Sequence, residues 1–158
     1  MLIELQLNGK EIACEADSSM RAIDFLREQC GITGCKEGCG SGECGACAIW
    51  IDGTTKLSCL MLAAQLHGHS ITTVEGLSDT AKNPHPVQQG FAVKGAVQCG
   101  YCTPGMVMTA AELLRHNQKP GRETIRQALS GNLCRCTGYH KIVDGVEEAA
   151  KIMQEQDK

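Results

Sequence analysis

Eleven cysteines in 158 residues constrain this chain more than any other feature of its sequence. Eight of them fall into two spaced groups, one in each half of the chain. The first residues include no basic region followed by a long apolar core, so no secretory signal is visible. Cysteine-rich chains without an export signal are more often metal-binding or catalytic than crosslinked by disulfides. The sequence therefore predicts metal chemistry and a cytoplasmic location.

The first group has three cysteines in the pattern C-x4-C-x2-C and a fourth cysteine after eleven further residues. The triplet matches the plant-type ferredoxin spacing for a [2Fe–2S] cluster. Glycines are interleaved with these cysteines, as expected where a backbone must approach cluster sulfides closely and donate N–H hydrogen bonds to them. A structural zinc loop is the alternative, but zinc sites usually show two short Cys/His pairs. The predicted ligands are Cys39, Cys44, Cys47 and Cys59, and the interleaved glycines are Gly38, Gly40, Gly42 and Gly45.

The second group has a C-x2-C pair and, after thirty-one residues, a C-x-C pair. Each pair lies at the end of an expected helix, so a helical bundle can bring the two pairs together as a four-thiolate site. From spacing alone an iron–sulfur cluster is favoured over zinc, which four thiolates in two pairs could also hold. A redox-active C-x2-C dithiol is a third interpretation, which the second pair disfavours. The predicted ligands are Cys99, Cys102, Cys134 and Cys136.

Apolar periodicity divides the chain into two regions of different architecture. In the first, alternation predicts a β-hairpin that turns at Asn8-Gly9, then a helix and further strands, which together describe a small α+β sheet domain. In the second, helical spacing predicts four helices of modest length, as in a small bundle. Turn-forming residues over 77–86 predict a linker between the two regions. The expected strands cover residues 2–7, 10–15, 48–51 and 71–74, the helices cover 19–29, 87–97, 103–114, about 125–129 and 142–153, the segment 57–66 is apolar and partly helical, and 34–47 is a loop.

Composition excludes two classes of function. The 15 basic residues are balanced by 18 acidic ones, giving a net charge of −3, which argues against a polybasic nucleic-acid surface. The hydrophobic fraction is 42%, and no apolar run approaches the ~18 residues of a membrane span. We therefore expect neither nucleic-acid binding nor a membrane span.

Three motifs occur together and in a fixed order. They are CGSGECGAC over residues 39–47, QCGYCTPG over 98–105 and GNLCRCTGY over 131–139. In these motifs the chain resembles the small iron–sulfur subunit of the molybdenum hydroxylases, the xanthine dehydrogenase and aldehyde oxidoreductase family. The resemblance covers essentially the whole chain, and it favours a second [2Fe–2S] cluster over zinc in the second half.

The resemblance implies a β-grasp, plant-type ferredoxin domain over residues 1–76 and a four-helix-bundle [2Fe–2S] domain over 77–158. It implies a large partner subunit that binds molybdopterin beside the second cluster, with Gln98 and Cys136 bordering the pterin. Electrons would run one at a time from molybdenum through the second and then the first cluster to FAD, on an expected medium subunit, or to another acceptor. Substrate oxidation would take place on the large subunit, so we expect no catalytic residue on this chain. Such complexes often form dimers of the heteromer.

Two other functions remain possible at this point. A free-standing two-cluster ferredoxin would shuttle electrons between separate enzymes, and a cysteine-rich zinc module would bind another protein. The remaining cysteines, Cys14, Cys30 and Cys35, are interpreted as non-ligands, the first two as small core side chains. Trp50 is expected to pack in the core, and contact with a partner subunit is its alternative role.

Overall fold

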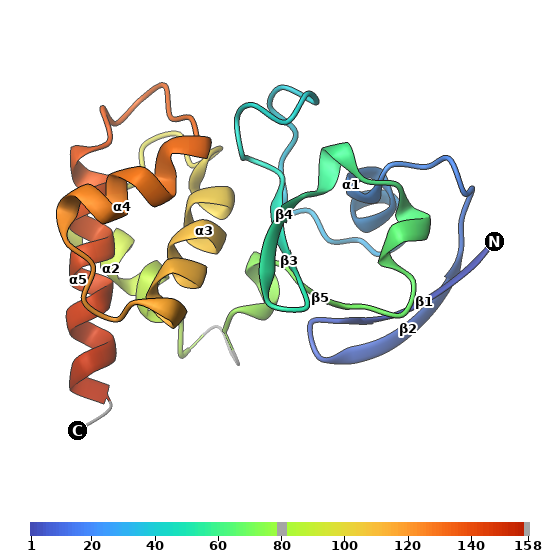
Figure 1. Cartoon of the computed structure of the whole chain (residues 1–158), viewed down its shortest axis with the longest axis horizontal. Coiled ribbons are helices and arrows are strands. Elements are labelled where there is room, and N and C mark those ends of the chain that lie inside the picture. The colour runs from blue at the N-terminus through green and yellow to red at the C-terminus, as the bar shows by residue number, and fades with distance from the viewer. Residues whose placement is uncertain (79–81, 157–158) are drawn as a thin grey trace.

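The computed structural model describes residues 1–78 and 82–156, which form a five-stranded mixed sheet followed by four α-helices (Figure 1). The strand order is β2-β1-β5-β3-β4. Strand β1 pairs in parallel with β5, and the other pairs are antiparallel. The mixed α+β class expected from the sequence is confirmed. The strands are β1 (Leu2–Leu7), β2 (Lys10–Glu15), β3 (Ala48–Ile51), β4 (Thr54–Leu57) and β5 (Ser70–Thr72).

The hairpin between β1 and β2 follows from the two residues at its turn. Asn8 and Gly9 have φ values of 50° and 80°, as a type I′ turn requires. The register that results pairs Leu7 with Lys10 and Leu2 with Glu15. Every second side chain of β1 is therefore buried on one face of the sheet, which is the predicted alternation.

The helix expected over 19–29 begins later and is irregular. It consists of α1 (Ala22–Asp24), which continues into a π-helical turn, η1 (Phe25–Gln29). Arg21 is extended, with φ −68° and ψ 149°. The main chain on either side of Arg21 is hydrogen-bonded to residues 61–63 rather than within a helical turn. Tertiary backbone pairing therefore overrides the helical pattern here.

The segment after β3 also differs from expectation, because the short strand β4 precedes the helical part. Strand β4 alternates exposed and half-buried residues and lies at the sheet edge, so its sequence contains few apolar residues. The apolar stretch that follows forms two 3₁₀ turns, η2 (Ser58–Leu60) and η3 (Ala63–Leu66), and a third, η4 (Val74–Gly76), follows β5.

The four helices expected in the second region are present, and their bounds lie within three residues of the predicted ones. Pro86 starts the first of them and Pro104 lies in the first turn of the second, as expected for a residue without an N–H. Part of the predicted linker, residues 79–81, lies outside the described residues. The helical elements are α2 (Pro86–Lys94), α3 (Thr103–His116), α4 (Arg122–Ala128) with the 3₁₀ turn η5 (Leu129–Gly131), and α5 (His140–Gln156).

Strand β3 is buried on both faces and joins two hydrophobic clusters. Ile49 and Ile51 pack in the cluster formed by the sheet, α1 and the 3₁₀ turns. Ala48 and Trp50 point the other way, into the cluster formed by α2–α5. The Trp50 indole N–H donates to the carbonyl of Met108 in α3 at 3.0 Å, so Trp50 packs in the core as expected. This contact fixes α3 against the sheet.

Candidate iron–sulfur site

The first cysteine loop, residues 36–47, connects α1 and its π turn to β3. Its backbone has positive φ at three glycines, Gly40, Gly42 and Gly45. A Cβ atom on Gly38 would lie 2.8 Å from the Cys44 sulfur, so a side chain there would fill the space beside that thiol. The predicted role of glycine, to bring backbone close to the sulfurs, is consistent with this geometry.

The Cys39 thiol receives hydrogen bonds from the backbone N–H groups of Ser41 and Glu43, at 3.4 and 3.3 Å. The hydrogen bond from Ser41 is the main cause that lowers the pKa of Cys39 to about 6, and the backbone of Cys44 contributes as well. Such donors favour the thiolate, which is the form that binds metal.

The other half of this site is buried. Cys47 begins the turn into β3 and lies beside Cys59 in η2, with the charge of Cys44 also nearby. Ser58 holds the two segments together, because its hydroxyl and its N–H both donate to the Cys47 carbonyl, at 2.8 and 3.3 Å. Burial raises the pKa of Cys47 to about 12.

The second group of cysteines comes from two separate turns. Cys99 and Cys102 lie between α2 and α3, and Cys134 and Cys136 lie between η5 and α5. Fold packing brings the turns together, so that Cys102 lies beside Cys134 and Cys99 lies beside Cys136. Burial, and then the neighbouring Cys134, raise the pKa of Cys102 to about 12.

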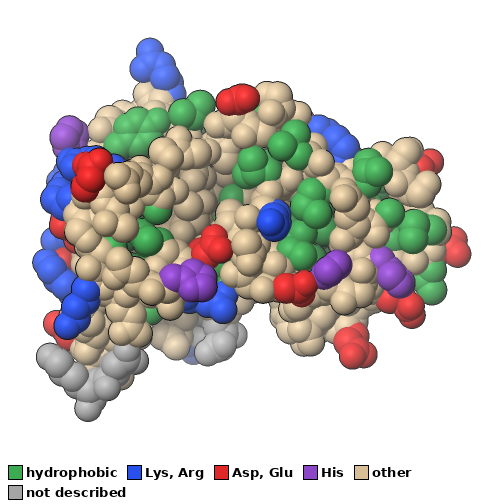
Figure 2. Space-filling model, in the orientation of Figure 1, with side chains coloured by type: hydrophobic (Ala, Val, Ile, Leu, Met, Phe, Trp, Pro, Cys, Tyr) green, Lys and Arg blue, Asp and Glu red, His purple; other side chains and the backbone are tan. Residues whose placement is uncertain are grey.

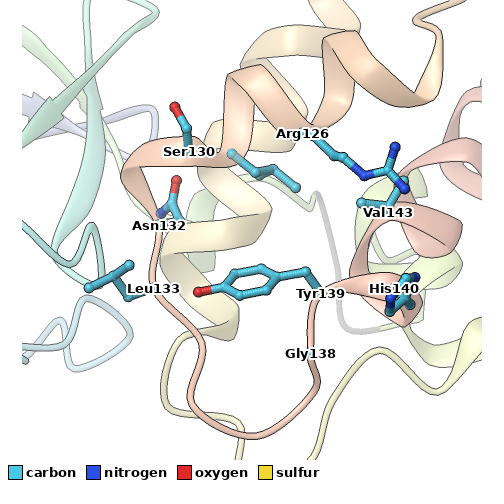
Figure 3. A pocket seen from close by; sticks show the side chains of 9 residues that line it. Arg126, Ser130, Asn132, Leu133, Gly138, Tyr139, His140 and Val143 are labelled. Atoms are coloured by element: carbon cyan, nitrogen blue, oxygen red, sulfur yellow. The ribbon is translucent and has the colours of Figure 1, made fainter.

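The turn that carries Cys134 is held by short-range hydrogen bonds. The Thr137 hydroxyl and N–H lie 3.0 and 3.4 Å from the Cys134 sulfur. Burial raises the pKa of this thiol, but the hydrogen bonds from Thr137, from the Cys136 backbone and with Cys102 together outweigh it, so the net pKa is lowered. The backbone N–H of Cys134 donates to the Tyr139 hydroxyl at 2.9 Å, and Figure 3 shows the Tyr139 ring reaching across the loop. A cavity of about 310 Å³ lies behind this ring, between α4 and the start of α5.

The eight predicted ligands therefore lie in two regions of four, which we call the first and second foursome. In the first, Cys47 lies beside Cys59 and the backbone of Cys44 donates to the Cys39 sulfur. In the second, Cys102 lies beside Cys134 and Cys99 lies beside Cys136. Amide and hydroxyl donors face one thiol of each foursome, and glycine leaves room at the sulfurs of the first. This donor set fits a thiolate-bound [2Fe–2S] cluster at each place. Across residues 1–78 and 82–156, no three His, Cys, Asp or Glu side chains converge as they would on a single metal ion.

The remaining predicted residues lie as follows. Gln98 and Cys136 are both exposed, at the end of the molecule where the second foursome lies. Cys35 is buried, and burial raises the pKa of its thiol to about 11. Cys14 and Cys30 are half-buried against the sheet cluster, as expected for small core side chains.

Sequence reasoning missed that the two cysteine regions touch. The N–H of Leu133 donates to the carbonyl of Cys44 at 2.9 Å, and the buried Asn132 amide donates to that of Gly45 at 3.2 Å. A Cβ on Gly105 would lie 2.2 Å from the Gly45 carbonyl oxygen. A glycine inside a helix often marks a place where another backbone approaches closely, so Gly105 in the expected helix 103–114 could have indicated this contact.

Comparison with known families and curated proteins supports iron–sulfur binding. Residues 73–147 match the [2Fe-2S] binding domain family. The chain is 48% identical over 149 residues to the nicotinate dehydrogenase small FeS subunit of Eubacterium barkeri, covering 94% of each chain. It is also 48% identical over 151 residues to the xanthine dehydrogenase iron-sulfur-binding subunit of Escherichia coli O157:H7, again covering 94% of each. These matches support the [2Fe–2S] prediction over zinc for the second half of the chain.

A solved structure extends the agreement to the fold. Quinoline 2-oxidoreductase from Pseudomonas putida 86 contains a chain that is 43% identical and superposes with a TM-score of 0.94, over 100% of this chain and 98% of that one. High identity and full-length superposition together show common family membership. The chain therefore belongs to the small iron–sulfur subunits of the molybdenum hydroxylase family, which includes the xanthine dehydrogenases, and it is a component of an oxidoreductase.

Proposed function

We propose that this chain relays electrons one at a time from a molybdenum centre on a large molybdopterin-binding subunit, through two [2Fe–2S] clusters, to FAD or another acceptor. The observation that supports the proposal is that the predicted ligands pair closely within each of two cysteine regions, and that the loops of these regions touch. When bound, each cluster supplies a one-electron carrier. Cys39, Cys44, Cys47 and Cys59 would hold the first cluster, and Cys99, Cys102, Cys134 and Cys136 the second.

The chain's own groups prepare these sites. The N–H groups of Ser41 and Glu43 stabilise negative charge on the Cys39 sulfur, and Thr137 does the same for Cys134. Burial of Cys47 and Cys59 keeps water from one side of the first site, and Cys102 in the second site is half-buried. Burial and hydrogen bonds to sulfur are the factors by which a protein sets the potential of such clusters.

The second foursome is the side we assign to the large subunit. Exposed apolar side chains surround its turns, although most large apolar side chains of the described chain are buried. Gln98 and Cys136 are exposed among them and would border the pterin. A partner that covers this surface would bury apolar area that now faces water. These side chains are Val97, Tyr101, Leu133 and Tyr139.

Other expected partners follow the family. A medium FAD-binding subunit would accept electrons from the first cluster, and the complex would form a dimer of heteromers. The relatives support a subunit rather than a free carrier, because the curated names are those of small or iron–sulfur-binding subunits. Figure 2 shows both acidic and basic side chains on this face, the basic ones mainly over its left half, and the net charge of −3 is small for the strongly acidic docking face of a free ferredoxin.

We further propose the division into a β-grasp domain over residues 1–76 and a four-helix-bundle domain over 77–158, both in the cytoplasm. Two hydrophobic clusters support the division, one around the sheet and one around α2–α5. The sheet ends at Thr72 and α2 begins at Pro86, which brackets the proposed boundary. In the part of the chain that the structure describes, no helix has the length and hydropathy needed to cross a bilayer.

The test is the iron, molybdenum and zinc content of the native complex, purified through a tag on this chain. Two [2Fe–2S] clusters predict about four iron atoms per chain. Molybdenum near one per chain, in a co-purifying large subunit, supports the whole proposal. Iron without molybdenum or a large subunit would instead favour a free two-cluster carrier, and zinc in place of iron would contradict both.

A further inference from the structure

The first cysteine loop is joined to the second cysteine region at both of its ends. At the far end, Leu133 and Asn132 donate to the carbonyls of Cys44 and Gly45. At the near end, the Tyr101 hydroxyl donates to the backbone carbonyl of Glu37 at 2.5 Å. Tyr101 lies between Cys99 and Cys102, and Glu37 lies two residues before Cys39. The Tyr101 bond therefore connects the segment that carries Cys39 with the turn that carries the first cysteine pair of the second site.

The two ends are held by different kinds of contact. The contacts at Cys44 and Gly45 are made by a backbone N–H and by a side chain that is only 5% exposed. The Tyr101 side chain is 50% exposed in this chain, so packing within the chain fixes it less than Asn132, and its hydroxyl bond ties it to the first loop. Loss of this one oxygen atom would therefore break the Tyr101 contact.

Glu37 is held from its other side as well. Its two carboxylate oxygens accept from Arg21 at 2.6 and 2.9 Å, and Arg21 also donates twice to Asp24 at the end of α1. The segment before Cys39 is thus fixed between α1 on one side and Tyr101 on the other.

We propose that Tyr101 is a positioning residue for electron transfer between the two clusters. Its hydroxyl holds the Cys39 end of the first loop against the second site, and so sets the separation across which the electron passes. Electron tunnelling slows steeply as the separation between carriers grows, so a loop that moves away more often transfers electrons more slowly. The inference rests on the proposed function, because it requires both clusters.

The test is Tyr101→Phe in the intact complex, which removes one oxygen atom and keeps the ring. Iron content and the two cluster signals in electron paramagnetic resonance are measured first. Electron equilibration between the clusters is then followed after flash photoreduction with a deazaflavin, together with the spin–spin splitting of the fully reduced protein. Loss of one net hydrogen bond shifts the balance between the held and the displaced loop about two- to tenfold toward the displaced form. We expect electron equilibration to slow by up to the same factor, and the splitting to weaken. Unchanged equilibration and splitting would overturn the proposal, as would a rate change fully explained by shifted midpoint potentials.

The matched control is Tyr139→Phe. It removes the same atom from the second region, but from a bond to the Cys134 N–H that does not reach the first loop. We expect its spectral changes to be confined to the second cluster, and an equal slowing in this variant would contradict a specific role for Tyr101. If Tyr101→Phe loses iron, the variant complex is reconstituted with iron and sulfide, and only preparations with about four iron atoms per chain are compared with the wild type. A variant that cannot be reconstituted would show that Tyr101 is needed to hold a cluster rather than to position the first loop, and would also overturn the proposal.

These measurements distinguish a failure of the proposed relay function from a failure of the positioning role of Tyr101. A wild-type complex with about four iron atoms per chain and two cluster signals supports the proposed function whatever Tyr101→Phe does. An unaltered Tyr101→Phe complex then overturns only the role of Tyr101. A wild-type complex with a single cluster signal overturns the proposed function, and the positioning role with it.

Discussion

The two cysteine sites reach a similar arrangement by different routes. In the first, three thiols lie within nine consecutive residues, Cys39–Cys47, and a turn after β4 adds the fourth. In the second, two pairs thirty-one residues apart meet only because α3, α4 and α5 fold together. The first site depends mainly on local glycine geometry, and the second on helix packing. The spacing of the cysteines is thus enough to recognise the local motif, whereas a site assembled from distant turns can be recognised only once the fold is known.

The electrostatics of the two sites are nonetheless alike. Each has one thiol whose pKa is lowered by N–H or hydroxyl donors, Cys39 and Cys134. Each also has one thiol whose pKa burial raises to about 12, Cys47 and Cys102. In the first site these two thiols also differ in exposure, since Cys39 is exposed and Cys47 is buried, whereas in the second site Cys102 and Cys134 are both half-buried.

The largest expected effect comes from the place where the two sites meet. In Gly105→Ala, the new Cβ would lie 2.2 Å from the Gly45 carbonyl oxygen, and backbone cannot move aside cheaply. We expect the free energy of unfolding to fall by about 3 kcal/mol, at the upper end of overpacking effects, although alanine is the better helix former. Denaturant unfolding followed by circular dichroism measures it, and the emission of Trp50, the single tryptophan, reports separation of α3 from the sheet.

Gly131→Ala is the control for this prediction. No atom outside its chain neighbours lies within 4 Å of the position that the added methyl group would take, and its φ is not positive. Its stability should change by less than about 0.5 kcal/mol. Equal losses in the two variants would mean that close approach at Gly105 does not control the joint between the sites.

The second prediction compares the exposed thiol of the first site, Cys39, with its buried thiol, Cys47. In the cluster-free chain at pH 7.5, Cys39 should be mostly thiolate and Cys47 almost entirely thiol, given pKa values of about 6 and about 12. After allowing for the lower nucleophilicity of a low-pKa thiolate, alkylation of Cys39 should be about 50-fold faster. Iodoacetamide labelling with peptide mass spectrometry measures both rates. Similar alkylation rates at Cys39 and Cys47 would show that the two thiols do not differ in environment as the structure indicates.

The third prediction concerns the contact that joins the sheet to α3. Trp50→Phe removes the indole N–H that donates to Met108 and the ring edge around it. The free energy of unfolding should fall by about 1–2 kcal/mol, from the lost buried hydrogen bond and reduced packing. Chemical denaturation followed by circular dichroism tests this. Val93→Ala, at a residue 66% exposed on α2, should be nearly neutral, and a comparable loss there would count against a specific role for Trp50.

The smallest effect is electrostatic and belongs to the helical region alone. The Asp144 carboxylate of α5 accepts from Arg122 of α4 at 2.8 Å, and this bond lowers the pKa of Asp144. A depressed carboxyl pKa gives stability that is present above the unfolded value, about 4, and is lost as the pH falls through the folded value. Asp144→Asn should therefore lower Tm slightly at pH 7 and not at pH 3. A difference that persists at pH 3 would show that charge is not its origin.

Much of the local structure could be predicted from the sequence. The Asn8-Gly9 turn and the alternation of β1 specified the hairpin, because both depend on residues a few positions apart. The helix expected over 19–29 was partly wrong, since the backbone beside Arg21 bonds to residues 61–63 instead of forming a helical turn. Strand β4 was missed because an exposed edge strand needs few apolar residues.

The cysteine spacing by itself determined which residues could bind metal, because a thiolate cluster needs particular ligands at particular separations. Only the tertiary structure decided that the two cysteine regions touch, through Tyr101 and Glu37 at one end and through Leu133 and Cys44 at the other. The physical reason is that the acceptor of each bond is a backbone carbonyl, which every residue possesses, and at Cys44 the donor is a backbone N–H as well. Such groups leave no mark in a sequence, and only the packing of α3 on β3 brings them within hydrogen-bonding distance.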